Sequence, residues 1–141
     1  MMRLEHLNFS VSDLERSIAF YRAALGGEVR WRGLTRDGRP AAHVGDARQY
    51  LAFFEAVASP SRLVDDSLRP GFNHFGFVVD ALDAAAARLA TLGVRPHHET
   101  DEAPGRRLYL RDPDGVEIEL VEYADADEPL SVPGEARGRG A

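Results

Sequence analysis

Apolar and polar positions alternate along several short stretches of the chain, and two of these stretches lead into a helical pattern. Between positions 4 and 11, apolar residues alternate with polar or small ones, which is typical of a strand with one buried face. Ser12 or Asp13 is expected to cap the helix that follows. Apolar residues then recur at helical spacing, and a glycine pair ends the pattern: Leu14, Ile18, Tyr21, Leu25 and Gly26-Gly27.

Three further strands complete this first unit. Residues 28–31, 41–44 and 49–55 have strand-like composition, and the first two are separated by a tight turn at 36–39. The pattern therefore predicts the element order βαβββ.

The same order is repeated 68 residues later. His6 and His74 each begin an apolar strand that leads into a helix, and the same offset pairs Phe9 with Phe77. Asp80 is the expected cap of the second helix, which Gly93 should end. The expected elements of the second unit are a strand at 73–79, a helix at 82–92, a strand at 94–98, a loop at 99–105, and strands at 107–111 and 116–123.

Two such units predict an α+β fold. We expect one domain over residues 1–123, made of modules 3–56 and 72–123 with a linker at 57–71, and a disordered tail at 124–141. Neither module buries a sheet face alone, so their sheets should pair edge to edge into a curved eight-stranded surface around a cavity. The helices would lie outside, and the two histidines would converge on the cavity.

Composition narrows the possible chemistry. The chain has 141 residues, a net charge of −6 and no cysteine, and all 17 of its basic residues are arginine. Disulfides, cysteine metal ligands, thiol nucleophiles on the protein and a lysine Schiff base are therefore excluded. The acidic balance argues against nucleic-acid binding, and no apolar run is long enough to span a membrane. A cytoplasmic location is the expectation, since the first residues lead directly into a strand.

Two histidines and one carboxylate are candidate metal ligands. His6 and His74 are related by the repeat, and Glu119 lies in the strand after the turn Asp112-Pro-Asp-Gly115. Together they have the composition of a site for Fe, Mn, Ni or Zn. A histidine at the start of a strand is often structural, and Glu119 would face solvent with Glu117 if the outer sheet face carried both. The trio as a set favours the metal site.

Longer segments resemble the vicinal oxygen chelate superfamily, which includes glyoxalase I, thiol-transferring fosfomycin resistance proteins, extradiol dioxygenases and bleomycin-binding proteins. The resemblance extends over residues 3–123 and is carried by His6-Leu-Asn-Phe-Ser-Val-Ser-Asp-Leu14, Ser17-Ile-Ala-Phe-Tyr-Arg22, Asn73-His-Phe-Gly-Phe77, Tyr109-Leu-Arg-Asp-Pro-Asp-Gly115 and Ile118-Glu-Leu120. It implies a divalent metal held by His6, His74 and Glu119, a small-molecule substrate and a homodimer.

The chain departs from the glyoxalase I pattern at two positions. Ala52 is matched with Glu119 by the repeat and lies where glyoxalase I usually has a fourth ligand, and Ser10 replaces a frequent arginine. An open three-ligand site is similar to that of fosfomycin resistance proteins and some dioxygenases. By the same resemblance, Tyr109 would donate a hydrogen bond to the substrate, and Asn8 and Ala52 would line the cavity.

Two adjacent arginines, Arg106 and Arg107, are candidates for binding an anionic group, with strand-edge solvation as the alternative. Of the two, Arg107 is predicted to bind the substrate.

The resulting expectation is a metal-dependent enzyme acting on a small oxygenated substrate. The metal would bind two substrate oxygens and stabilise an enolate-like or alkoxide-like intermediate, and Glu119 would act as a base if it moved off the metal. A lyase or isomerase, a thiol transferase and a dioxygenase all remain open. The alternative is a protein that sequesters a small molecule without catalysis.

Overall fold

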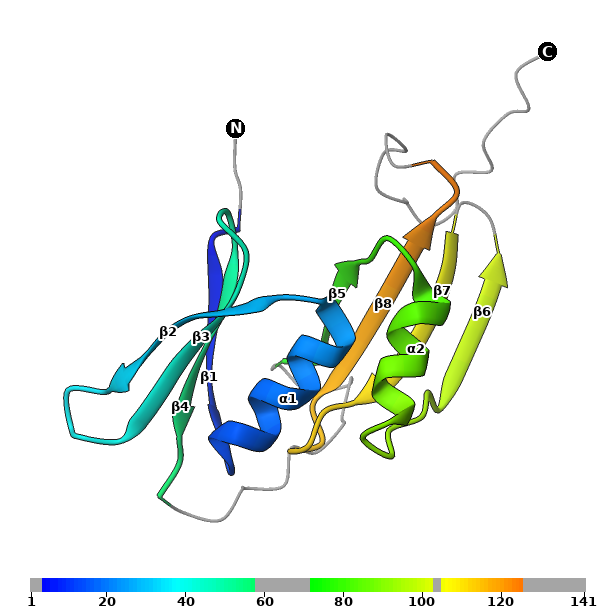
Figure 1. Ribbon diagram of the computed structural model, residues 1–141. Helices are drawn as coiled ribbons and strands as arrows, with labels where there is room; N and C mark the ends of the chain where they lie inside the picture. Colours follow the sequence, from blue (N-terminus) through cyan, green and yellow to red (C-terminus); the bar gives the residue numbers. More distant parts are fainter. Residues whose placement is uncertain (1–3, 58–71, 103–104, 126–141) are drawn as a thin grey trace.

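The computed structural model describes residues 4–57, 72–102 and 105–125. These residues form two βαβββ modules, which confirms the expected α+β class and the repeat (Figure 1). The predicted linker and the predicted tail fall almost entirely outside the described residues.

The first module builds one four-stranded mixed sheet, in the order β1-β4-β3-β2. Strand β1 runs parallel to β4, and the other neighbours are antiparallel. The elements are β1 (His6–Val11), α1 (Leu14–Leu25), β2 (Glu28–Leu34), β3 (Pro40–Gly45) and β4 (Tyr50–Glu55).

The second module repeats this arrangement in the order β5-β8-β7-β6, and β5 runs parallel to β8 as β1 does to β4. The elements are β5 (His74–Val78), α2 (Leu82–Ala90), β6 (His98–Glu102), β7 (Gly105–Arg111) and β8 (Glu117–Tyr123). The expected strand at 94–98 is wrong, because β6 begins only at His98 and occupies most of the expected loop. A polar sequence, His-Glu-Thr-Asp-Glu, forms this edge strand by pairing with β7.

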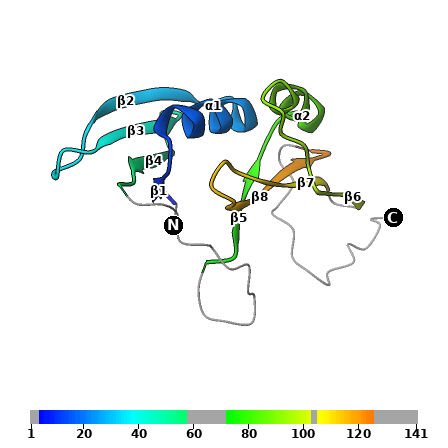
Figure 2. The ribbon, with the colours of Figure 1, turned by 90° about the horizontal axis from the view of Figure 1, so that it is seen from below.

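Helices α1 and α2 lie side by side and share one apolar core with the inner faces of both sheets (Figure 2). Among the described residues, no strand pair joins the first sheet to the second. The expected continuous eight-stranded surface is therefore two four-stranded sheets. The physical reason is that the two modules meet through their helices, which bury their apolar faces against each other.

Each helix starts against a carboxylate from the last strand of its own module. Glu55 accepts a hydrogen bond from the Leu14 N–H at 2.9 Å, and Glu122 accepts one from the Leu82 N–H at 2.5 Å. Asp13 also caps α1, as expected. The expected cap at Asp80 is wrong, because Ala81 occupies the cap position of α2 and Glu122 supplies the acceptor.

The turn between β7 and β8 connects the two modules. Its Asp112 accepts a hydrogen bond from the buried Tyr21 hydroxyl at 2.8 Å, and Asp114 accepts one from the Ser12 N–H at 3.0 Å. Within residues 4–57, 72–102 and 105–125, neither helix is long and apolar enough to span a membrane.

Candidate functional site

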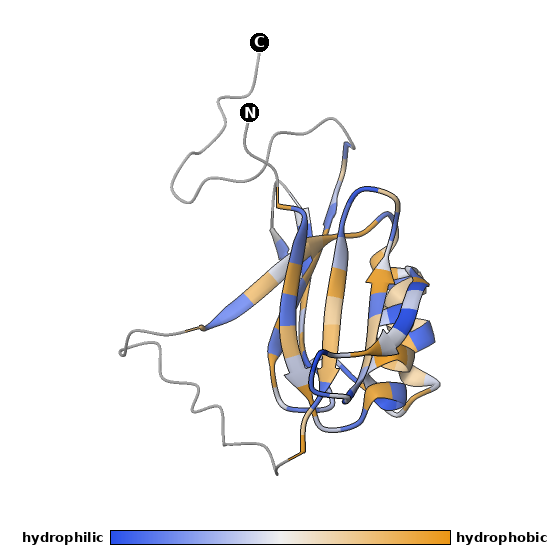
Figure 3. Ribbon diagram, turned by 90° about the vertical axis from the view of Figure 1, so that its left-hand side faces the viewer, coloured by the Kyte–Doolittle hydropathy of each residue, from blue (hydrophilic) through white to orange (hydrophobic). Residues whose placement is uncertain are grey.

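The predicted site residues lie on the sheet faces that point away from the helices. Strand residues alternate between the two faces, and the alternating colours along the strands in Figure 3 follow this period. Phe75, Ile118 and Leu120 face the core, so their neighbours His74 and Glu119 face the other way. The register pairs Gly76 with Glu119 and Glu119 with Tyr109, which sets these positions side by side.

His74 and Glu119 form the centre of the site. The Nε2 atom of His74 lies 3.2 Å from Oε2 of Glu119, and its Nδ1 atom lies 2.6 Å from Oδ1 of Asn73. The ring thus has an acceptor at each nitrogen, the Asn73 oxygen at Nδ1 and the Glu119 carboxylate at Nε2. A metal ion bound at Nε2 would leave the ring proton on Nδ1, facing the Asn73 oxygen. Two donors that bind one ion at right angles, each about 2.1 Å away, lie about 3 Å apart. The pair therefore fits two neighbouring ligands of a metal ion.

Two further side chains surround Glu119. Arg107 donates from Nε to Oε1 of Glu119 at 2.8 Å, and both side chains are mostly buried. Tyr109 lies in the neighbouring strand, and its pKa is raised by burial and then by the charge and hydrogen bonding of Glu119. Tyr109 therefore keeps its proton and is a hydrogen-bond donor. The ring of His98 lies 5.6 Å from that of Tyr109.

The equivalent face of the first sheet has a different character. His6 stacks on Tyr50 with ring centroids 5.0 Å apart, and Tyr50 stacks on His43 at 4.6 Å. Trp31 extends this row of rings, 4.9 Å from His43. Burial and then the positive charges of His6 and Arg30 lower the pKa of His43. This row holds the His6 ring against the sheet.

Ala52 occupies the place in the first sheet that Glu119 occupies in the second. Asn8 pairs with Ala52 just as Gly76 pairs with Glu119. The amide of Asn8 donates to the Ala52 carbonyl oxygen at 3.3 Å, so these two residues lie beside each other on the His6 face.

The expected convergence of His6 and His74 is not seen within one chain. Nδ1 of His6 lies 3.0 Å from Oε2 of Glu5, on the first sheet. Within the described part of the chain, no three His, Asp or Glu side chains gather closely enough to bind one ion. His6 lies on the first sheet and the His74–Glu119 pair on the second, and within the described residues no strand pair joins the two sheets.

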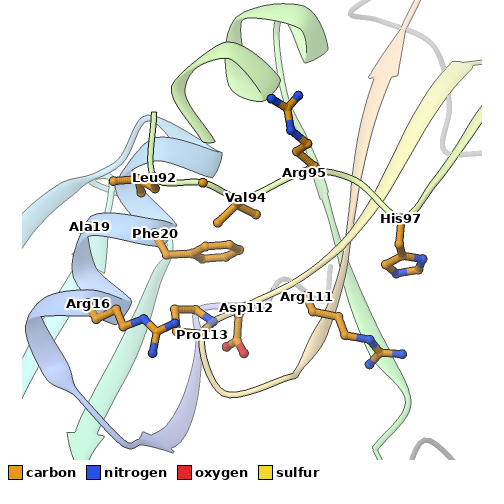
Figure 4. A pocket seen from close by; sticks show the side chains of 11 residues that line it. Arg16, Ala19, Phe20, Leu92, Val94, Arg95, His97, Arg111, Asp112 and Pro113 are labelled. Carbon is orange, nitrogen blue, oxygen red and sulfur yellow. The ribbon is translucent and has the colours of Figure 1, made fainter. Parts of the chain in front are cut away.

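Three cavities lie near the sheets and helices. The cavity that His6 itself lines has a volume of about 320 Å³ and also includes Phe77 and Val78 of β5. A second, of about 380 Å³, lies next to His6 and is lined by Glu5, Arg30, Trp31, His43, Ala47, Arg48 and Tyr50. A third, of about 500 Å³, lies on the helix side, between α1, the segment before β6 and the β7–β8 turn (Figure 4). Its Arg95 and Arg111 side chains point away from Phe20, and none of the predicted ligands lines it.

Two residues that contact the proposed histidine ligands are not predicted by the sequence pattern. Asn73 was identified only as part of a motif, although its position directly before His74 places its oxygen at the ring. Tyr50 carries no sequence signal of its own, because its contact with His6 depends on the parallel pairing of β1 with β4.

Comparisons with known proteins agree with this architecture. The model of the Glyoxalase/Bleomycin resistance protein/Dioxygenase superfamily matches residues 3–120. The chain is 26% identical to a "Probable lactoylglutathione lyase, chloroplastic" of Arabidopsis thaliana over 91% of the chain and 38% of the relative. It is 34% identical to a catechol-2,3-dioxygenase of Bacillus subtilis over 85% of the chain and 40% of the relative. The chain thus spans about two fifths of the length of these two relatives.

A relative of similar length is the metallothiol transferase FosB of Lysinibacillus sphaericus. The two are 30% identical over 83% of the chain and 79% of that protein. Among solved structures, a glyoxalase/bleomycin resistance protein/dioxygenase domain from Frankia sp. has a TM-score of 0.71 and 25% identity, covering 87% of the chain and 98% of the domain.

A mutant of the fosfomycin resistance protein FosX from Listeria monocytogenes, complexed with Mn(II) and dihydroxypropylphosphonic acid, has the same fold. Its TM-score is 0.65 at 21% identity, and the match covers 86% of the chain and 92% of FosX.

Proposed function

Because the chain belongs to the glyoxalase/bleomycin resistance protein/dioxygenase superfamily, we propose that it is a metal-dependent enzyme acting on a small oxygenated substrate. The observation that carries the proposal is the contact of His74 with Glu119, two metal-binding groups aimed at each other on an open sheet face. A divalent Mn, Fe, Ni or Zn ion at this site would supply Lewis acidity toward two neighbouring substrate oxygens.

The third ligand in this proposal is His6 of a second copy of the chain. One chain presents His74 and Glu119 on one sheet and His6 on the other, and within the described residues no third ligand joins the His74–Glu119 pair. A homodimer that sets the first sheet of one copy against the second sheet of the other brings the three groups together. Both sheet faces would then be enclosed, which also accounts for exposed apolar side chains such as Trp31 and Val78.

The other residues of the two faces have roles that follow from their chemistry. Tyr109, protonated beside Glu119, would donate a hydrogen bond to a substrate oxygen. Asn8 and Ala52, which lie beside each other on the His6 face, would line the cavity of the assembled site.

Three reaction classes are consistent with this site. The relatives include a lactoylglutathione lyase, a catechol dioxygenase and a metallothiol transferase. Enzyme assays decide whether this chain is a lyase or isomerase, a dioxygenase or a thiol transferase. Oxygen consumption with catechols, thiol loss with fosfomycin, and isomerisation of a glutathione–methylglyoxal adduct distinguish them.

Metal analysis of the purified protein tests the proposal. After incubation with Mn, Fe, Ni or Zn and removal of the excess, the wild type should retain about one ion per chain. His6→Ala and Glu119→Gln should each lose most of it. His97→Ala, which lies outside the trio, is the matched control and should retain the ion. A wild type that binds none of the four metals contradicts the enzyme proposal and favours sequestration of a small molecule without catalysis.

A further inference from the structure

Arg107 forms an ion pair with the one carboxylate of the proposed ligand set. Its Nε atom donates to Oε1 of Glu119 at 2.8 Å, and its Nη1 atom donates to the carbonyl oxygen of Gly105 at 3.0 Å. The side chains of Arg107 and Glu119 are only 17% and 15% exposed. The guanidinium is therefore held by hydrogen bonds from two of its nitrogens, in a setting where water screens its charge weakly.

The two oxygens of Glu119 consequently have different neighbours. Oε1 is taken by Arg107, whereas Oε2 lies 3.2 Å from Nε2 of His74. Only Oε2 faces Nε2 of His74, so a metal ion bound by both residues would contact this oxygen. A carboxylate held in this way can offer one oxygen to an ion, and it cannot rotate to offer both without breaking the bond to Arg107.

We infer that Arg107 is a positioning residue that fixes Glu119 as a one-oxygen metal ligand and offsets its negative charge. This inference rests on the proposed function. The other two ligands are imidazoles. Because Arg107 balances the negative charge of Glu119, the protein leaves most of the positive charge of the ion uncompensated. The site then favours a substrate that brings negative charge on its chelating oxygens, such as a deprotonated diol or an oxyacid. It also argues against Glu119 leaving the ion to act as a base.

The neighbouring Arg106 provides a matched control. It lies on the same strand but on the opposite face, where it pairs with the exposed Asp83 at 3.0 Å. Replacing either arginine with glutamine removes one positive charge from β7, and only the Arg107 change touches Glu119.

The test is a measurement of Co²⁺ affinity, by competition with a chelator, together with the visible absorption of the bound Co²⁺. Arg107→Gln should bind Co²⁺ about tenfold more tightly, because a positive charge beside the ion is removed. Its absorption bands should change as Glu119 becomes free to bind through both oxygens. Arg107→Lys, which keeps the charge, should restore the wild-type affinity, and Arg106→Gln should match the wild type in both measurements. A loss of folding or packing alone would not tighten metal binding.

The inference is overturned if Arg107→Gln binds Co²⁺ no more tightly than Arg106→Gln, or if its spectrum is that of the wild type. Should Arg107→Gln not fold, Arg107→Met replaces it with the same expected result. A wild type that binds no Co²⁺ is a different outcome, because it removes the proposed metal site itself.

Discussion

The two modules differ most at the residues proposed to carry the chemistry. At equivalent register positions the first sheet has Ala52 and the second has Glu119. Only the histidine is shared, so in the proposed site one sheet supplies a single ligand and the other supplies two. The sequence predicted that Ala52 matches Glu119, because the strand segments 51–55 and 118–122 can be aligned with each other, and the strand register agrees. The ion pair of Arg107 with Glu119 could not be predicted, since it depends on the path of a long side chain.

Asp112 provides a residue-scale prediction about pH. Burial raises the pKa of its carboxyl above the ordinary 3.8, against the opposing effect of its hydrogen bonds with Tyr21 and the backbone. A raised pKa means that the folded protein holds this proton more tightly than the unfolded chain does. The contribution of Asp112 to stability is thus fully present below pH 3.8 and is lost as the pH rises through the raised pKa.

Asp112→Asn should therefore gain stability relative to the wild type as the pH increases from about 4 to 7, measured by urea unfolding at each pH. Asp83→Asn is the control, and its stability relative to the wild type should change with pH in the opposite direction. Arg106 lowers the pKa of Asp83, so the stability that Asp83 contributes is lost as the pH falls. Parallel pH profiles for the wild type and Asp112→Asn would contradict the assignment.

At the scale of elements, the sequence predicted most helices and strands and the Asp13 cap of α1, but not the carboxylates of β4 and β8 at the helix starts. Periodicity located α1 and the strands of the first module because their apolar positions alternate clearly. It failed at β6, whose polar residues become a strand only by pairing with β7. It also gave no sign that Glu55 and Glu122, near the ends of β4 and β8, accept hydrogen bonds from the first helical turns. Such long-range caps leave no local signature.

Removing either cap should destabilise the fold. Glu55→Ala and Glu122→Ala should each lower the free energy of unfolding by about 1 kcal/mol, because a backbone N–H at a helix start loses its charged acceptor. Glu28→Ala is the control, since its ion pair with Arg22 is exposed and should contribute less than about 0.5 kcal/mol. Equal losses for all three variants in urea unfolding would show that the caps have no special role.

At the scale of the whole molecule, the repeat predicted two modules but not how they meet. Helix-to-helix packing joins them, and the Asp112 turn adds hydrogen bonds to Tyr21 and Ser12. The sequence could not distinguish this arrangement from edge-to-edge pairing, because both bury similar apolar faces. The difference matters for function, since within the described residues no third ligand joins His74 and Glu119, and the proposed site therefore takes His6 from a second copy.

A mixed dimer tests this central claim most directly. His6→Ala and His74→Ala chains with different tags are co-expressed, the mixed dimer is isolated, and its bound metal is measured. Each parent homodimer should bind almost no metal, because every site lacks one histidine. In the mixed dimer, one site would carry both substitutions and the other none, so about one ion per dimer is predicted. A mixed dimer as empty as its parents would contradict a site shared between chains.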